Sequence, residues 1–230
     1  MVGFWLNDVE KSQVIKILWI TLIIASLSLL TWAGLLLGRG AFWATSEKLG
    51  TTGESPELDS WPSIQVLIPA RNEGTVLPRT LPSVLNQDYP GDLRVTLVDD
   101  HSEDGTGKVA RSIARETDSV TVLEVTEPPE TPAGWTGKVW ALHHGFQKTE
   151  ASRPQLIWLT DADIFHSPET ARKLAAKLIK EDLSLASVMA DLQTEGFWEK
   201  LLIPNFVYYF SMIYPFSWVN NSAKETAAAA

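Results

Sequence analysis

The sequence contains no cysteine and no concentrated run of basic residues, and each absence excludes a class of protein. Without cysteine the chain forms no disulfide framework and no thiolate zinc site, so a metal would have to be held by histidine or carboxylate. Lysine and arginine number 19 against 28 aspartate and glutamate residues, which gives a formal net charge of −9. Because nucleic acids are bound mainly through clustered cations, we expect no nucleic-acid partner. Any phosphate that the protein binds must be held locally.

A Walker A loop is also missing, and so is a convincing zinc pattern. The glycine required five residues before each Gly-Lys pair is replaced by Ser102 or Pro132, which argues against a P-loop ATPase. His143 and His144 are adjacent, so we expect them to point to different sides of a helix. His166 follows two aspartates closely enough to be a candidate ligand.

One long apolar run lies near the N-terminus. Residues 18–38 carry no charge over 21 residues, a length that spans roughly 30 Å as a helix and so fits the core of a bilayer. We predict a transmembrane helix at about 18–38 within an N-terminal anchor, residues 1–43. A cleaved signal peptide is the alternative, but the run is longer than usual for one and no A-x-A cleavage site follows it. Residues 44–62 are polar and predict a linker.

After the linker, β-rich runs alternate with helical ones, which is typical of an α/β domain with a largely parallel sheet. The expected strands are 64–68, 93–98, 120–125, 156–160 and 185–189. The expected helices are 77–87, shortened or kinked by Pro82, then 105–116, 138–148 and 167–180. In the last of these we expect Ser167 as N-cap, Pro168 in the first turn, and Leu174, Leu178 and Ile179 on the buried face.

Polar clusters follow four of these segments, at the edge of the sheet where ligands bind in open parallel folds. Asp161 and Asp163 come after an apolar strand, and alternate side chains of extended chain face the same way. Two neighbouring carboxylates repel each other unless a cation lies beside them, and Mg²⁺ or Mn²⁺ with a substrate diphosphate would meet that need. The alternative is that one aspartate caps the next helix while the other is solvated.

The other clusters suit a nucleotide. Asp99 and Asp100 end the second strand, where a carboxylate can accept hydrogen bonds from a nucleobase or ribose. For Asp104 in the following turn we favour helix capping. Lys138 opens a helix behind two glycines, a favourable place for a diphosphate. Arg71 and Glu73 form an ion pair at the cleft edge or contact the nucleotide, and both readings stay open.

Five motifs, in this order and spacing, resemble the family 2 glycosyltransferases, most closely their hopene-associated branch: VLIPARNEG, TLPSVLNQDYPG, LVDDHSEDGT, GWTGKVWAL and WLTDADIFHSPE. The resemblance starts at about residue 63. It implies a GT-A fold over residues 63–195, a nucleotide-sugar donor, with a UDP-sugar expected, and a lipid acceptor. It also implies a Mg²⁺ or Mn²⁺ ion on Asp161 and Asp163, with Arg71, Glu73, Asp99, Asp100, Lys138 and Asp161 lining the donor site. Family members continue into an acceptor half with an acidic pair as catalytic base, so the base is expected beyond Ala230.

Residues 196–230 begin with an aromatic-rich segment interrupted by Pro204, Asn205 and Pro215, which we interpret as an element lying at the membrane interface. An ordinary core segment is the alternative. The leading hypothesis is a metal-dependent, membrane-anchored glycosyltransferase, inverting by family analogy, whose domain faces the cytoplasm, where nucleotide sugars are made. A non-catalytic nucleotide-binding membrane module is the alternative function. A sugar nucleotidyltransferase is disfavoured, because the segment after the first strand lacks a Gly-rich basic loop.

Overall fold

The computed structural model describes residues 8–44, 49, 57–119, 121–150, 152–221 and 223–225. The chain divides into two compact units, and each is described here by itself. One comprises residues 49–190 and is called the sheet unit; the other comprises residues 1–48 and 191–230 and is called the helical unit. Most of the predicted linker and the last five residues lie outside the described part of the chain.

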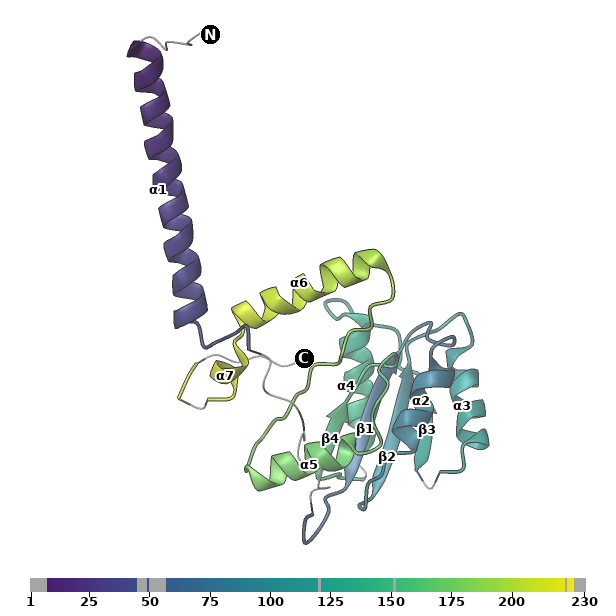
Figure 1. Cartoon of the computed structure of the whole chain (residues 1–230). Helices are drawn as coiled ribbons and strands as arrows, with labels where there is room; N and C mark the ends of the chain where they lie inside the picture. Colours follow the sequence, from purple (N-terminus) through teal and green to yellow (C-terminus); the bar gives the residue numbers. More distant parts are fainter. Residues whose placement is uncertain are drawn as a thin grey trace. The chain divides into compact units, whose positions relative to one another are not determined.

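The sheet unit is built on four parallel strands in the order β3-β2-β1-β4 (Figure 1). The strands are β1 (Ile64–Ala70), β2 (Leu93–Asp99), β3 (Val122–Thr126) and β4 (Leu156–Leu159). Every pairing between neighbours is parallel. Four helices connect or follow the strands: α2 (Leu77–Leu85), α3 (Thr106–Glu116), α4 (Gly137–Thr149) and α5 (Thr170–Lys180). The α/β class with a largely parallel sheet is therefore confirmed.

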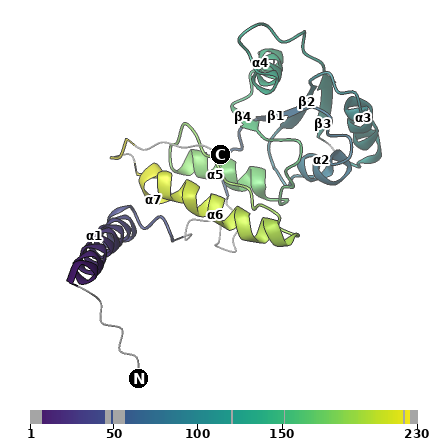
Figure 2. The same cartoon turned by 90° about the horizontal axis from the view of Figure 1, so that it is seen from above.

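Alternation along the strands divides the core between the two faces of the sheet. Helices α2, α3 and α5 cover one face, whereas α4 covers the other (Figure 2). The first face carries the larger cluster, with Val66, Ile68 and Val95 among its fully buried side chains. On the second face Leu67 and Val98 approach Gly145 of α4 so closely that a side chain there would press against them. The small residue lets α4 lie close to the sheet, which fixes the position of the N-terminus of that helix.

Three predictions about this unit are wrong in detail. No strand forms at the predicted 185–189, and Leu185 is 69% exposed, because β-rich residues form a strand only where a partner edge accepts them. Helix α5 begins at Thr170 with Glu169 as its N-cap residue, not at Ser167. Its buried residues are Ala171, Ala175 and Ala176, while Ile179 is exposed. Small residues face the core there because α5 packs closely against the rest of it.

Pro82 lies inside α2, and the helix ends at Leu85 instead of reaching residue 87. Proline cannot donate a hydrogen bond to the preceding turn, so α2 lacks one helical bond there.

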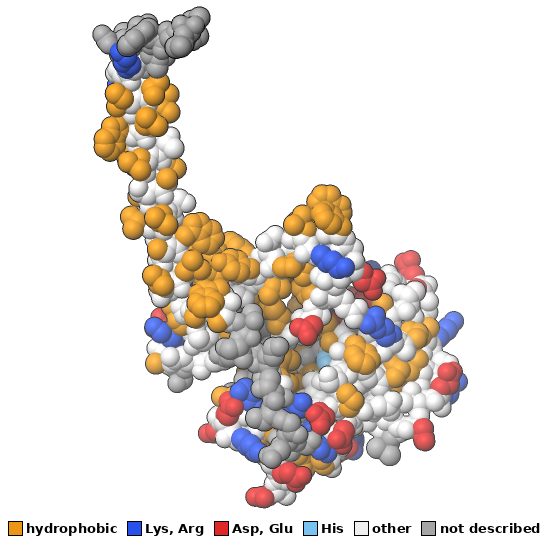
Figure 3. All heavy atoms as spheres, in the orientation of Figure 1, with side chains coloured by type: hydrophobic (Ala, Val, Ile, Leu, Met, Phe, Trp, Pro, Cys, Tyr) orange, Lys and Arg blue, Asp and Glu red, His pale blue; other side chains and the backbone are white. Residues whose placement is uncertain are grey.

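The helical unit contains α1 (Asp8–Gly38), α6 (Phe197–Ile213) and α7 (Phe216–Val219). Among the described residues one helix, Lys11–Gly38, has the length and composition needed to cross a membrane, a test that a signal sequence also passes. This helix starts earlier than the predicted 18–38. Hydrophobic side chains follow it along its length (Figure 3). Helix α6 continues through Pro204 and Asn205 for 17 residues, so the proline does not end it.

Candidate active site

A cleft of about 350 Å³ opens at the carboxyl ends of β1, β2 and β4 and reaches the start of α4. It is where an open parallel sheet is expected to bind its ligand. Six of the seven residues proposed from the sequence line it: Arg71, Glu73, Asp100, Lys138, Asp161 and Asp163. The cleft wall is completed by Pro69, Ala70, Gly137, Ala141 and Ala162.

The loop after β1 is held by side chains of the loop after β2. The backbone N–H of Asn72 donates to Ser102 Oγ at 2.9 Å, and Asn72 Oδ1 accepts from the N–H of Glu103 at 2.9 Å. The N–H of Glu73 donates to Thr106 Oγ1 at 2.9 Å. Asn72 has a φ of 58°, a left-handed conformation that asparagine tolerates better than most residues. These bonds fix the backbone that presents Arg71 and Glu73 to the cleft.

Asp104 completes this connection and confirms the helix-capping role favoured for it. Its Oδ1 accepts from the N–H of Thr106, the first residue of α3, at 3.0 Å. Its Oδ2 accepts from the N–H of Gly74 at 2.9 Å. These hydrogen bonds lower the pKa of Asp104, led by the bond from the Thr106 hydroxyl. Asp104 therefore stays ionised as a structural acceptor.

The two adjacent carboxylates at the end of β2 have different surroundings. Asp99 lies on the α3 side of the sheet, where its oxygens accept from the N–H groups of Ser102 at 3.2 Å and Gly107 at 3.0 Å. Asp99 does not line the cleft. Asp100 does, with a side chain only 7% exposed, and Arg71 Nη1 lies 3.6 Å from its Oδ2. Among the described residues Arg71 forms its ion pair with Asp100, and the ion pair with Glu73, one of the two alternatives that the sequence left open, is not formed.

The sequence did not single out His101 or Gly137 for the surroundings of Asp100. His101 Nδ1 lies 3.3 Å from Asp100 Oδ1, and its Nε2 lies 3.6 Å from Glu127 Oε1. His101 has a φ of 56°, in the left-handed region of backbone conformation. A Cβ at position 137 would collide with the Asp100 carboxylate, so only glycine fits there without a shift. The Gly-Lys pair was a visible signal for Gly137; the histidine carried no recognisable pattern.

Lys138 lies in the first turn of α4, and its ammonium is 2.7 Å from Asp161 Oδ1. No N-cap side chain bonds to the first turn of this helix, since Thr136 makes no cap hydrogen bond. The free N–H groups and the partial positive charge of a helix N-terminus favour an anion. The exposed ion pair and this terminus lie together at one end of the cleft.

Asp161 and Asp163 both line the cleft, although for a different reason from the one expected. Residues 162 and 163 form a turn after β4 instead of extended chain. Ala162, between the two aspartates, is 6% exposed and packs into the core, while its carbonyl accepts a hydrogen bond from the Thr80 hydroxyl at 2.6 Å. Anchoring Ala162 inward leaves both carboxylates outward.

The pKa of Glu73 reflects the negative charge of the nearby carboxylates. Its pKa is raised, first by burial and then by the carboxylates of Asp163, Asp104 and Asp161. A cation in the cleft would relieve this repulsion. Among the described residues there is no group of three or more histidine, cysteine or acidic side chains placed to hold a metal ion. Two carboxylates nevertheless suit Mg²⁺ or Mn²⁺, which commonly take the remaining oxygens from substrate phosphates and water.

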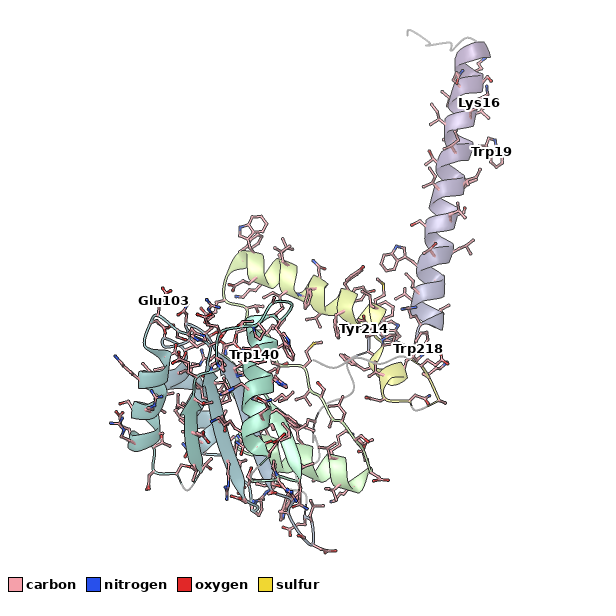
Figure 4. The ribbon with its side chains drawn as sticks, turned by 180° about the vertical axis from the view of Figure 1, so that it is seen from behind. Lys16, Trp19, Glu103, Trp140, Tyr214 and Trp218 are labelled. Atoms are coloured by element: carbon pink, nitrogen blue, oxygen red, sulfur yellow. The ribbon has the colours of Figure 1, made fainter. Side chains whose placement is uncertain are left out.

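His166 is not part of this cleft, contrary to its candidacy as a ligand. Its ring is buried against Trp158, with centroids 4.8 Å apart, and its Nε2 lies 2.8 Å from Thr160 Oγ1. Burial lowers the pKa of His166 to about 4, so the ring is neutral at physiological pH. His143 and His144 diverge as predicted: His143 stacks on Trp140 of α4, labelled in Figure 4, whereas His144 Nε2 lies 3.4 Å from Thr126 Oγ1.

Comparison with known proteins places these observations in a family. The sequence model described as "Glycosyl transferase family 2" matches residues 65–222, more than half of the chain. A relative in Bacillus subtilis, "Probable glycosyltransferase YdaM", is 38% identical over 109 residues, covering 47% of this chain and 24% of the relative. The "Beta-monoglucosyldiacylglycerol synthase" of Trichormus variabilis is 26% identical over 144 residues, covering 61% of this chain and 29% of the relative.

A solved structure is also similar at low identity. It is titled "Mannosyltransferase PcManGT from Pyrobaculum calidifontis in complex with GDP-Man and Mn2+", and it is 21% identical with a TM-score of 0.49. The match covers 67% of this chain and 42% of that one. The matches to the two curated relatives thus span only about a quarter to a third of the length of those proteins.

Proposed function

This chain belongs to glycosyl transferase family 2, and we propose that its cleft binds the diphosphate of a nucleotide sugar, with a divalent cation, for transfer of the sugar to a membrane lipid. The observation that carries the proposal is the meeting of Lys138, the N-terminus of α4 and the Asp161–Asp163 turn in one cleft. The ammonium of Lys138 suits the diphosphate itself, whereas the two carboxylates suit a divalent cation that is bound to the diphosphate.

The surroundings of each residue in and beside the cleft indicate which part of the nucleotide sugar it would contact. Lys138 now pairs with Asp161, and the arriving diphosphate would share its ammonium and occupy the free N–H groups of α4. That arrangement offsets the negative charge that builds on the departing nucleotide. Asp100, held by Arg71 and His101, would accept hydrogen bonds from the nucleoside, for which we propose a UDP-sugar. Asp99 supports the site indirectly, by holding the start of α3.

Asp161 and Asp163 are the residues that would hold Mg²⁺ or Mn²⁺. When bound, such an ion stabilises negative charge on the leaving diphosphate. The protein supplies two carboxylates, and Glu73 adds negative potential nearby without a contact to either. The chain therefore binds the ion best when nucleotide is present to complete its oxygen ligands. We assign no base for the acceptor hydroxyl among the described residues.

The acceptor and the location follow from the helical unit. Helix Lys11–Gly38 would anchor the protein in a membrane, with the sheet unit on the cytoplasmic side. A lipid acceptor is supported by the name of the diacylglycerol relative, and a hopanoid by the resemblance of the five sequence motifs. An enzyme anchored beside its acceptor works in two dimensions, which raises the effective concentration of the lipid.

Calorimetric titration of UDP into the detergent-solubilised chain tests the donor site. With Mn²⁺ we expect saturable binding, and with EDTA we expect UDP affinity to fall at least about hundredfold, because chelation removes the ion that would link the diphosphate to Asp161 and Asp163. For substitutions of Asp161 or Asp163, Asp92→Asn is the matched control, because Asp92 pairs with Arg94 at 3.1 Å on the surface of the same unit. Binding that is unchanged by EDTA, or absent from a folded protein, would refute the proposal.

A further inference from the structure

Helix α6 carries an exposed apolar stripe that nothing in the sheet fold explains. Its members recur at helical spacing and all lie on one side of the helix. We call the following five residues the aromatic stripe: Trp198, Leu202, Phe206, Tyr209 and Ile213. Trp198 is 68% exposed and Tyr209 is 58% exposed. Large side chains in such a row mark an interaction surface on a soluble protein.

The chain around the stripe is also unusual in its charge. Residues 201–223 contain no aspartate, glutamate, lysine, arginine or histidine. The nearest charges before this stretch in the sequence include Glu199 in the first turn of α6, whose Oε2 accepts from the N–H groups of Glu195 and Gly196, each at 2.8 Å. An uncharged helix surface that begins at a polar turn is suited to a partner whose interior is apolar.

The end of α6 is joined to the end of α1 by a corner built from residues far apart in sequence. Arg39, just after α1, donates from Nε to the carbonyl of Met212 and from Nη2 to that of Ile213 at 3.1 Å. The guanidinium satisfies carbonyls that a helix C-terminus leaves free and lies at the negative end of the helix dipole. It also lies 5.5 Å from the centroid of the Trp218 ring.

Two further contacts tighten this corner. Phe42 is 3% exposed and packs edge-on against Tyr208, with centroids 5.1 Å apart. Gly40 has a φ of 58°, and a Cβ there would lie 2.6 Å from Trp218 Nε1, so glycine is needed both for the turn and for the contact. The Ser217 hydroxyl donates to the Gly40 carbonyl. Tyr214 and Trp218 are labelled beside the end of α1 in Figure 4.

From these observations we propose that α6 is an in-plane membrane helix, lying at the headgroup level of the bilayer that α1 enters, with the aromatic stripe toward the acyl chains. The proposal rests on the membrane anchor of the proposed function. If α1 crosses the bilayer, its last residues and the corner lie at the boundary, so the C-terminal end of α6, which the corner holds, lies there too. Tyrosine and tryptophan side chains favour that depth, and Arg39 can reach lipid phosphates while capping α6.

The length of α6 favours lying flat over crossing. Seventeen residues rise by about 25 Å, less than the roughly 30 Å of a hydrocarbon core. An apolar acceptor leaving the bilayer would then meet an aromatic surface first. The protein would thus present its lipid substrate from a helix that is separate from the donor cleft.

Depth measurements on single labels test this, and the absence of cysteine makes every introduced cysteine unique. The full chain is reconstituted in vesicles of phosphatidylcholine and phosphatidylglycerol, with a fluorophore on Trp198→Cys or Tyr209→Cys. Leu27→Cys in the middle of α1 reports the anchor, and Arg115→Cys on α3 is the control outside both helices. Quenchers are carried either near the headgroup or deep in the acyl chains.

We expect both α6 labels to be quenched at least about twofold more by the shallow quencher, and to equal extents. The Leu27→Cys label should show the opposite preference. A spanning α6 would separate the two labels by about 16 Å in depth, so unequal quenching overturns the proposal. Unquenched α6 labels beside a quenched Leu27→Cys label would mean that protein, including a second copy, covers the stripe. An unquenched Leu27→Cys label would overturn the anchor itself and this proposal with it.

Discussion

The two units of this chain differ in where they place their apolar and charged side chains. In the sheet unit a large cluster of apolar side chains is buried between helices and strands, and six charged side chains line one cleft. In the helical unit most of the large apolar side chains of α1 and α6 are exposed, and the carboxylate of Glu199 lies at the start of α6. This contrast is what our proposals require: water and a hydrophilic donor for the first unit, and lipid for the second. Each of the following substitutions changes one unit, and two of them, Asp163→Asn and Gly40→Ala, also test whether the other unit responds.

The largest effect is expected at the Asp161–Asp163 turn, where we propose that the divalent ion binds. Asp163→Asn removes one of two carboxylates available to the ion, and we expect UDP affinity in the presence of Mn²⁺ to fall about hundredfold. Calorimetry with Asp92→Asn as control measures this. The comparison between units predicts that lipid quenching at Tyr209→Cys does not change. An Asp163→Asn protein that binds UDP as the parent does would remove the turn from the site.

The next effect concerns stability and pH. Because burial lowers the pKa of His166 to about 4 from 6.5, the unfolded state binds more protons between these values. Stability is therefore complete above pH 6.5 and is lost as pH falls toward 4, by about 2 kcal/mol between pH 7 and pH 5. Urea unfolding of the full chain at both pH values measures this loss.

His166→Gln provides the comparison for that experiment, since glutamine does not titrate. Its unfolding free energy should change less between pH 7 and pH 5 than that of the parent. An equal change in both proteins would show that other groups cause the acid sensitivity.

Removal of the cleft ammonium should have a smaller effect. Lys138→Ala deletes a charge that we place beside the diphosphate, and UDP affinity should fall about tenfold. Lys108→Ala is matched to it, because Lys108 is an exposed lysine in the first turn of α3. Raising the salt concentration should reduce the difference in UDP affinity between Lys138→Ala and Lys108→Ala, because charge interactions at an exposed site are screened. Equal affinities at low salt would contradict the role of Lys138.

The smallest effect is expected from the corner of the helical unit. Gly40→Ala places a side chain against Trp218 in a left-handed backbone, which should cost about 1 kcal/mol locally. Limited proteolysis after residue 39 should become faster, whereas UDP affinity should stay unchanged. Gly34→Ala is the control, because a Cβ there meets nothing within 4 Å. A loss of UDP binding in Gly40→Ala would show that the two units are coupled.

Much of the sheet unit was predictable because strand and helix periodicities differ and the polar ends of strands meet at one edge. Those two facts predicted the parallel sheet and brought six residues to one cleft. The failures arose where the outcome depends on which face a residue takes. Asp99 and Asp100 are neighbours in sequence, and only the position of α3 determines which one leaves the cleft. Likewise, the sequence made His166 a candidate ligand, whereas the structure shows its ring in contact with Trp158 and Thr160.

The helical unit was harder to predict, because hydrophobicity alone does not distinguish a core from a membrane surface. Pro204 suggested a break, yet α6 continues through it. The run at 185–189 shows the same limit for strands, since its β-rich composition could not reveal the lack of a partner. The corner at Arg39 and Gly40 joins positions about 175 residues apart in sequence, a contact that no local pattern encodes.

The central claim is that two carboxylates and a nucleotide diphosphate share one divalent ion. Electron paramagnetic resonance of free Mn²⁺ tests it most directly, because the signal of the aqueous ion falls as the ion is bound. We predict little loss of signal when the full chain is added alone, a large loss when UDP is added with it, and no such loss with Asp161→Asn or Asp163→Asn beyond that caused by UDP itself. Mn²⁺ binding that UDP does not strengthen, or that survives both substitutions, would contradict the account.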